Sequence, residues 1–212
     1  MVGLKLTALK LRALEQIART VAACPATRHL VLRGGLRTRC WYGDATRPVD
    51  DVDYLCVEPR PPASARDELA TALGLAADHP FSIIWPDSPC PGMRLSVPML
   101  GFEVQIDVGF GDPVLPPPRV ANVPGIGEVL TVAPETMLAW KLHGMFELGP
   151  RGRWRAKDVY DAYRIIRHVG MDPALAKAAI ELAFSSRGDS TTMMAPLVLG
   201  DFGHSRSSRK RW

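Results

Sequence analysis

Residues 30–57 read LVLRGGLRTRCWYGDATRPVDDVDYLCV, and we expect the rest of the chain to be arranged around them. It begins with a short apolar run, continues through a Gly34-Gly35 pair and a short segment expected to be helical, and ends in an alternating segment with Asp51 and Asp53. Because side chains alternate along a strand, the two aspartates share one face. Two adjacent carboxylates repel each other and need a cation nearby. The simpler alternative is the solvated end of a loop, and the D-x-D triplet alone favours it.

Length and composition indicate a globular protein. The chain has 212 residues, 47% of them hydrophobic and 23% charged, which suits one large or two small domains. No apolar run reaches the roughly 18–20 residues that a membrane-spanning helix needs, and the amphipathic N-terminus lacks a secretory signal. The four cysteines form no Cys-x-x-Cys pair, so we expect reduced thiols, no zinc site and a cytoplasmic protein. A net charge of +4 permits an anionic partner.

The pattern along the chain predicts the α+β class. Helices are expected over residues 5–22, 64–77 (with Ser64 as N-cap), 134–148, 155–168 and 172–185, and strands over 29–33, 51–57, 81–85, 93–100 and 101–109. We expect four parts: a core with an N-terminal helix (1–112), a Pro-rich connector (113–126), a helical region that completes the active site (127–186) and a flexible basic tail (187–212).

A third carboxylate belongs to the strand expected at residues 101–109. Asp107 shares the polar face of that strand with Glu103 and Gln105. If this strand neighbours the D-x-D strand, three carboxylates converge, and such a cluster suits a hard divalent cation. The alternative is a solvated polar face of a sheet.

One lysine stands in the apolar stripe of the helix expected at residues 134–148. Lys141 lies among Met137, Leu138 and Met145, where an unpaired ammonium is costly to bury. Either its head extends past its neighbours into water, or it meets an anion in a cleft, and we favour the anion. On that interpretation methionine at this position removes activity but keeps or raises thermal stability. His143 falls on the polar face and is expected to be solvated.

Residues 151–161, RGRWRAKDVYD, combine basic and aromatic side chains at a helix start. The basic residues around Trp154 are Arg151, Arg153, Arg155 and Lys157. Such interleaving suits RNA, since cations contact phosphates and rings stack on bases, although a solvated, salt-bridged helix start has the same composition. The Gly34-Gly35 pair permits close approach to a phosphate, but it also suits any tight turn. The chain contains no G-x-G-x-x-G, P-loop or G-x-S-x-G motif.

Taken in order, these motifs resemble the AbiEii/AbiGii toxin family of nucleotidyltransferases within the DNA polymerase β superfamily. The resemblance covers residues 28–167 and is carried by Gly34-Gly35, Arg47 ahead of Asp51-Val52-Asp53, Ile106-Asp107-Val108 with the following GFGDP, PET through AWK (134–141), and RAKDVYD (155–161). It departs at Val49 and Leu36, where many relatives have hydroxyl residues. The implied fold is a minimal nucleotidyltransferase fold, a mixed or antiparallel sheet with flanking helices, plus a C-terminal helical bundle.

The resemblance also implies a reaction and roles for residues. A nucleoside monophosphate is transferred from a nucleoside triphosphate with Mg²⁺ or Mn²⁺, in relatives to the 3′ end of tRNA, and a cognate antitoxin is usual. Asp51, Asp53 and Asp107 are the implied metal ligands, and Asp107 also takes the acceptor proton. Gly34, Gly35, Arg47 and Lys141 are the implied triphosphate contacts, with Asp158 and Asp161 positioning Lys141 or the nucleotide. Two alternatives remain: transfer to a small molecule such as an aminoglycoside, and a nucleotide-binding module without activity.

Overall fold

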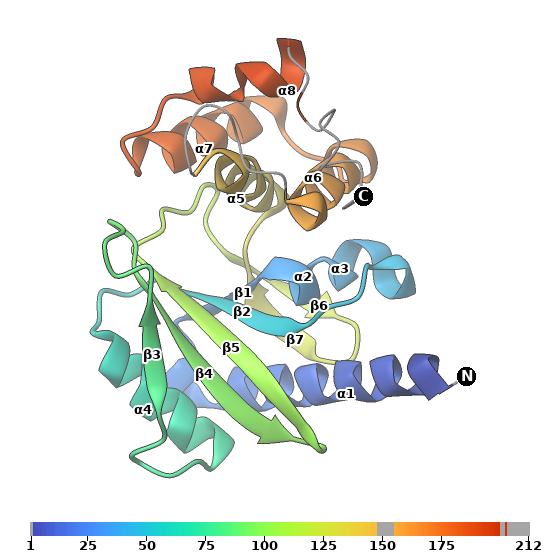
Figure 1. Ribbon diagram of the computed structural model, residues 1–212, viewed down its shortest axis with the longest axis vertical. Helices are drawn as coiled ribbons and strands as arrows, with labels where there is room; N and C mark the ends of the chain where they lie inside the picture. Colours follow the sequence, from blue (N-terminus) through green and yellow to red (C-terminus); the bar gives the residue numbers. More distant parts are fainter. Residues whose placement is uncertain (1, 148–154, 200–201, 203–212) are drawn as a thin grey trace. The chain divides into compact units, whose positions relative to one another are not determined.

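The computed structural model describes residues 2–147, 155–199 and 202, and it divides into two compact units (Figure 1). Unit 1 contains Met1–Asp112 and Pro118–Val132, and unit 2 contains Pro113–Pro117 and Ala133–Trp212. The Pro-rich stretch predicted as a connector is therefore shared between the units. Residues 113–117 belong to unit 2, and the chain then returns to unit 1 for two further strands.

Unit 1 is built on one seven-stranded mixed sheet, which confirms the predicted α+β class. In chain order the strands are β1 (Leu30–Arg33), β2 (Asp51–Cys56), β3 (Phe81–Ile84), β4 (Gly92–Met99), β5 (Phe102–Phe110), β6 (Arg119–Val123) and β7 (Gly127–Thr131). Their order in the sheet is β3-β4-β5-β2-β1-β7-β6. The β2–β5 and β1–β7 pairs are parallel and the other neighbours antiparallel, so the D-x-D strand lies at the centre of the sheet.

Two long helices, α1 (Val2–Ala23) and α4 (Pro62–Leu73), cover one face of this sheet (Figure 1). Leu14 and Ile17 of α1 share a buried core with Val52 of β2 and Ile106 of β5. Each such side chain contributes about 1.5–3 kcal/mol when fully buried. A slip of one residue in β2 or β5 would turn these side chains out of the core, so burial fixes the face on which the acidic side chains stand.

The segment between β1 and β2 is short and helical. It contains α2 (Gly34–Arg37), α3 (Arg39–Tyr42) and the 3-10 turn η2 (Gly43–Ala45); another 3-10 turn, η1 (Pro25–Thr27), precedes β1. Arg37 is only 2% exposed, and its Nε donates to the carbonyl of Val132 at 3.0 Å. Its guanidinium lies 4.2 Å from the centre of the Trp41 ring. Burial lowers the pKa of Arg37, and Arg119 adds to that effect. This arginine ties α2 to the end of β7.

Three boundaries differ from those predicted. Helix α4 begins at Pro62, and Ser64 lies inside its first turn, because a proline fits the first helical position and needs no N–H partner there. Residues 119–131 form the β6–β7 hairpin, which the many prolines just before it obscured. The predicted tail includes the 3-10 turn η3 (Thr191–Met194), where the Ser190 side chain accepts from the N–H of Thr192, and helix α8 (Ala195–Leu199).

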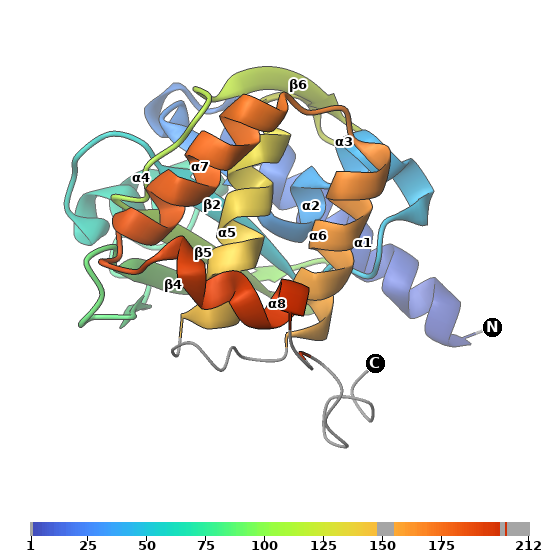
Figure 2. The same ribbon diagram turned by 90° about the horizontal axis from the view of Figure 1, so that it is seen from above.

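Unit 2 is helical, with α5 (Pro134–Phe146) between α6 (Ala156–His168) and α7 (Pro173–Ser185) (Figure 2). Met145 and Phe146 of α5 pack against Phe184 of α7 in its core. His143 is buried, not solvated as predicted, because its Nε2 lies 2.9 Å from Asp189 Oδ2 and its ring packs edge-on against Phe184. None of the helices in the described residues combines the length and apolar character needed to cross a membrane.

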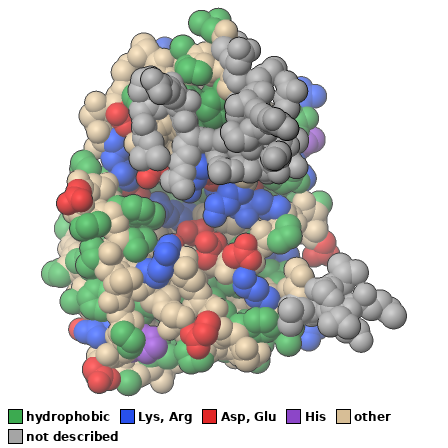
Figure 3. Space-filling model, in the orientation of Figure 1, with side chains coloured by type: hydrophobic (Ala, Val, Ile, Leu, Met, Phe, Trp, Pro, Cys, Tyr) green, Lys and Arg blue, Asp and Glu red, His purple; other side chains and the backbone are tan. Residues whose placement is uncertain are grey.

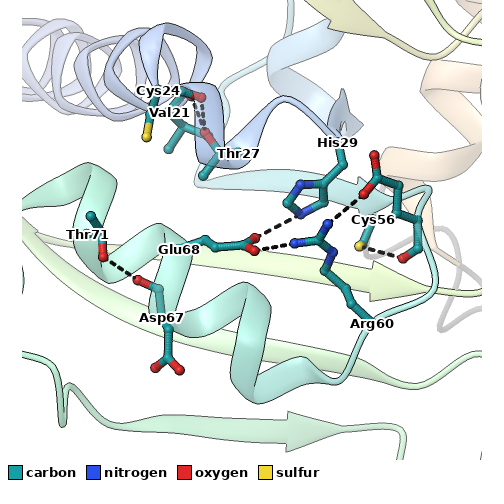
Figure 4. Close-up of polar contacts among 10 residues, drawn as sticks. Val21, Cys24, Thr27, His29, Cys56, Arg60, Asp67, Glu68 and Thr71 are labelled. Carbon is teal, nitrogen blue, oxygen red and sulfur yellow. Dashed lines mark hydrogen bonds and ion pairs between the residues drawn. The ribbon is translucent and has the colours of Figure 1, made fainter.

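A polar cluster around the buried His29 joins the start of β1 to α4 in unit 1 (Figure 4). His29 Nε2 lies 3.2 Å from Glu68 Oε2, and Arg60 pairs with both Glu68 and Glu58. Burial lowers the pKa of His29 and Arg60 lowers it further, while the two glutamates offset only part of the effect. The imidazole is therefore held in its neutral form in the folded protein.

This cluster predicts a pH dependence of stability. The unfolded chain takes up a proton at His29 near pH 6.5, whereas the folded protein does so only at lower pH. Stability from this site is therefore complete above about pH 6.5 and is lost as the pH falls through the folded pKa. When the pH is lowered from 7.5 to 5.5, we expect the free energy of unfolding measured in urea to fall less for His29→Gln than for wild type. His168→Gln, at an exposed histidine, should retain the wild-type slope.

Candidate functional site

A row of four charged residues crosses adjacent strands of unit 1. The Cα partners are Arg33 with Asp53 (β1–β2), Asp53 with Asp107 (β2–β5), and Asp107 with Arg94 (β5–β4). Residues opposite each other in paired strands carry their side chains on the same face. The structure therefore brings Asp107 beside the D-x-D strand, the condition on which the predicted cluster depended. Acidic and basic side chains lie next to one another over β2 and β5 in Figure 3.

Both carboxylate oxygens of Asp107 are engaged. Arg94 Nε donates to Oδ1 at 2.8 Å and Arg94 Nη2 to Oδ2 at 2.8 Å, which is a bidentate ion pair. Gln105 Nε2 also donates to Oδ2 at 3.1 Å. The alternation pattern of residues 93–100 does not single out Arg94. The signal that could have found it is a charged residue in an otherwise mostly apolar strand, facing Asp107 across the hairpin.

Arg94 is a cation on which all three acidic residues act. Its hydrogen bond to Asp107 raises the pKa of its guanidinium, and the charges of Asp107, Asp51 and Asp53 act in the same direction against the effect of burial. The Asp107 side chain is 8% exposed and the Arg94 side chain 42%. The carboxylate is thus buried in the structure, while the arginine that pairs with it is partly open to solvent.

The glycine pair packs directly on the D-x-D strand. Gly34 has φ +69°, and a Cβ built on it would lie 1.8 Å from Asp53 Oδ2, so only glycine fits there. A Cβ on Gly35 would lie 3.2 Å from Val49 Cγ1 and 3.3 Å from Arg47 Nη2. The structure therefore gathers Gly34, Gly35, Arg47 and Asp53 at one place, as the phosphate-cradle interpretation requires.

The GFGDP segment (109–113), which begins in the last two residues of β5, anchors the same end of the sheet. Arg33 Nη1 donates to Asp112 Oδ2 at 2.8 Å, and the Asp112 side chain is 4% exposed. A Cβ on Gly109 would lie 2.7 Å from Arg33 Nη2, so this glycine makes room for the ion pair. Because Arg33 directly precedes Gly34, the pair fixes the start of α2 beside Asp53.

Unit 1 contains carboxylates of the kind that bind a divalent cation. Asp51 and Asp53 provide half-buried carboxylates on one face, which is the ligand type that Mg²⁺ uses together with substrate phosphates. Within the described residues, however, no three His, Cys, Asp or Glu side chains form a group that could hold a metal ion. Among these residues Asp107 is turned to Arg94 and does not join Asp51 and Asp53 in such a group. The two aspartates of the D-x-D triplet fit the cation by themselves.

Unit 2 contains the second group of predicted residues. Lys141 Nζ lies 2.8 Å from Asp158 Oδ1 and 3.0 Å from Asp161 Oδ2, and the three side chains are 13%, 5% and 2% exposed. The anion predicted for Lys141 is therefore at least in part the protein's own pair of carboxylates. Burial alone would lower the pKa of Lys141, but Asp158 and Asp161 outweigh it and raise the pKa.

The four basic residues predicted to contact RNA differ in whether the structure describes them and in what they contact. Arg151 and Arg153 lie outside the described residues. Arg155 is engaged within unit 2, since its Nε lies 2.8 Å from Asp158 Oδ2 and its Nη1 3.3 Å from Glu147 Oε2. Lys157 is exposed. Gly144 makes room for Arg155, because a Cβ there would lie 3.0 Å from Arg155 Nη1.

Two solved structures are similar to this chain. A solved structure of a putative nucleotidyltransferase from Helicobacter pylori is similar over 94% of this chain and 85% of that chain, with a TM-score of 0.53 and 17% identity. A nucleotidyltransferase-like antigenic protein from Paracoccidioides brasiliensis covers 86% of this chain and 92% of its own, with a TM-score of 0.46 and 18% identity. No curated protein sequence is significantly similar.

The first of these structures supports the nucleotidyltransferase fold, and a family match adds to it. Residues 17–212 match the family described as "Nucleotidyl transferase AbiEii toxin, Type IV TA system". The match includes the D-x-D strand, the glycine pair and the Lys141 cluster. The chain therefore belongs to the AbiEii family of nucleotidyl transferase toxins.

Proposed function

We propose that the protein transfers a nucleoside monophosphate from a nucleoside triphosphate to an RNA acceptor, the 3′ end of tRNA, as the toxin of a toxin–antitoxin pair. The observation that carries the proposal is the packing of Gly34 on Asp53. It holds the Gly34-Gly35 backbone against one of the carboxylates on which a divalent cation would be bound. A sheet face with only solvated acids needs no such contact.

In the proposed reaction an acceptor hydroxyl oxygen attacks the α-phosphorus and gives up its proton to solvent water. The bond from the α-phosphorus to the oxygen that bridges the α- and β-phosphates breaks, and pyrophosphate leaves. Asp51 and Asp53 would hold Mg²⁺ or Mn²⁺, which when bound neutralises charge that develops on the phosphates. Gly34 and Gly35 let the backbone approach the triphosphate closely, and Arg47 adds a cation beside them. Catalysis of this kind rests on positioning and on fixed charges.

We assign Lys141 to the same reaction, as a cation for the triphosphate. Its ammonium has three N–H donors, and the contacts to Asp158 and Asp161 use two of them. The two aspartates would hold Nζ in one position and keep it charged, which is what a phosphate-binding lysine requires. Lys157, together with Arg151, Arg153 and Arg155, would attract the RNA backbone.

The test is label transfer with purified protein, total tRNA, Mg²⁺ and each α-labelled nucleoside triphosphate in turn. We expect label on tRNA with one of the four nucleotides. Asp51→Asn should reduce transfer by about a hundredfold or more, since it removes one of the two carboxylates that would hold the cation against the reacting phosphates. Label on an aminoglycoside instead of RNA would support the small-molecule alternative. Nucleotide binding without any transfer would support the binding module.

A further inference from the structure

We propose that Arg94 is a triphosphate-binding residue and that Asp107 is its positioning partner, not a metal ligand. The inference rests on the proposed function and assigns a residue of that site. Its basis is the bidentate pair, in which the 2.8 Å contacts of Nε and Nη2 fix the plane of the guanidinium against the carboxylate. A flexible surface arginine has no such fixed orientation.

The guanidinium keeps donors for a ligand. Arginine has five N–H donors, and Asp107 receives only two of them. The Arg94 side chain is 42% exposed although its partner is 8% exposed, so a ligand can reach this side chain without displacing Asp107. A cationic fork of this kind matches the oxygens of a phosphate.

The position of Arg94 suits a ligand shared with the D-x-D pair. Asp53, Asp107 and Arg94 are successive partners across β2, β5 and β4. The charges of Asp51 and Asp53 both act on the Arg94 guanidinium, so the three groups lie within electrostatic range of one another. A cation held by the two aspartates and a guanidinium beside it would present positive charge to the same chain of phosphates.

The alternative is that Asp107 leaves Arg94 to become a third metal ligand. This would break two charge-assisted hydrogen bonds and the Gln105 contact on a carboxylate that is 8% exposed. Binding a triphosphate through the outer donors of Arg94 requires no such rearrangement. The contacts therefore favour an Asp107 that stays paired and holds Arg94 in place over an Asp107 that leaves Arg94 to bind a metal ion.

The test uses the full chain and two probes, Mn²⁺ alone and inorganic tripolyphosphate with Mg²⁺, because the preferred base is unknown. Binding is measured for Arg94→Met, Arg94→Lys and Asp107→Asn, with Arg28→Met as the control at an exposed arginine. We expect Arg94→Met to weaken tripolyphosphate binding about tenfold or more, equivalent to about 1.4 kcal/mol, and to leave Mn²⁺ affinity within about twofold. Arg94→Lys should restore part of the affinity, since it keeps the charge but not the fork.

Two results would overturn the inference. One is a gain in Mn²⁺ affinity of Arg94→Met, which would mean that the arginine competes with metal for Asp107. The other is a loss of Mn²⁺ binding in Asp107→Asn. If Arg94→Met unfolds because a buried carboxylate is left without its guanidinium, the charge-balanced variant Arg94→Met/Asp107→Asn replaces it and should show the same tenfold loss. If wild type binds neither probe, the proposed function itself fails, which the Mn²⁺ titration reports independently of Arg94.

Discussion

Alanine at Gly34 is expected to reduce nucleotidyl transfer by about a hundredfold or more, the cost of misplacing a reacting group by about 1 Å. The added Cβ would lie 1.8 Å from Asp53 Oδ2, 2.5 Å from Asp53 Cγ and 2.7 Å from Asp53 Cβ. Either the aspartate leaves its position or α2 moves away from β2. The left-handed backbone at this residue, with φ +69°, adds strain of about 1–2 kcal/mol. In all we expect a loss of unfolding free energy of about 3 kcal/mol.

Gly74→Ala measures the strain of a left-handed alanine without the collision that a Cβ on Gly34 would make with Asp53. Gly74 has φ +65°, but a Cβ there would meet no atom within 4 Å. Urea unfolding should therefore show a loss of about 1–2 kcal/mol with transfer unchanged. Gly35→Ala should reduce transfer by less than Gly34→Ala, since its Cβ would lie 3.2 Å from Val49 Cγ1 and the residue has no left-handed backbone. If Gly34→Ala behaves like Gly74→Ala in both assays, the contact between Gly34 and Asp53 has no role in the reaction.

What could be predicted from the sequence is what depends on local periodicity. Alternation along residues 51–57 and 101–109 placed Asp53 on the same face as Asp51 and placed Asp107 on a polar face, because side chains on a strand alternate whatever the neighbouring strand is. The helical spacing around Lys141 likewise showed a cation in an apolar stripe. These inferences needed no knowledge of the tertiary structure.

What could not be predicted depends on strand register. Arg94 faces Asp107 only because β4 and β5 pair with that alignment, and Gly34 touches Asp53 only because α2 folds back over β2. The error at His143 also comes from a contact between distant residues, since its partner Asp189 is 46 residues away in the chain. A helical wheel describes one helix and contains no information about what packs against it.

Methionine at Lys141 is expected to remove activity and also to destabilise the protein, by about 3–5 kcal/mol. The sequence alone suggested the opposite for stability, because methionine suits an apolar stripe. The structure reverses that expectation: Nζ lies 2.8 Å from Asp158 Oδ1 and 3.0 Å from Asp161 Oδ2, on side chains that are 5% and 2% exposed. Removing the ammonium leaves two buried carboxylates without its charge. Lys177→Met, at a lysine 78% exposed and 3.8 Å from Glu181, should cost less than about 0.5 kcal/mol.

The triple variant Lys141→Met/Asp158→Asn/Asp161→Asn separates the structural role of Lys141 from its role in the reaction. It removes the buried charges together, so urea unfolding should show most of the lost stability restored, as replacing a complete buried ion pair is far less costly than breaking one. Label transfer should remain absent, because the cation proposed to bind the triphosphate is still missing. If transfer returns with stability, Lys141 acts only by holding α5 to α6. If Lys141→Met is as stable as wild type, the contacts to Asp158 and Asp161 contribute nothing to folding, and loss of transfer would then be the whole effect of the lysine.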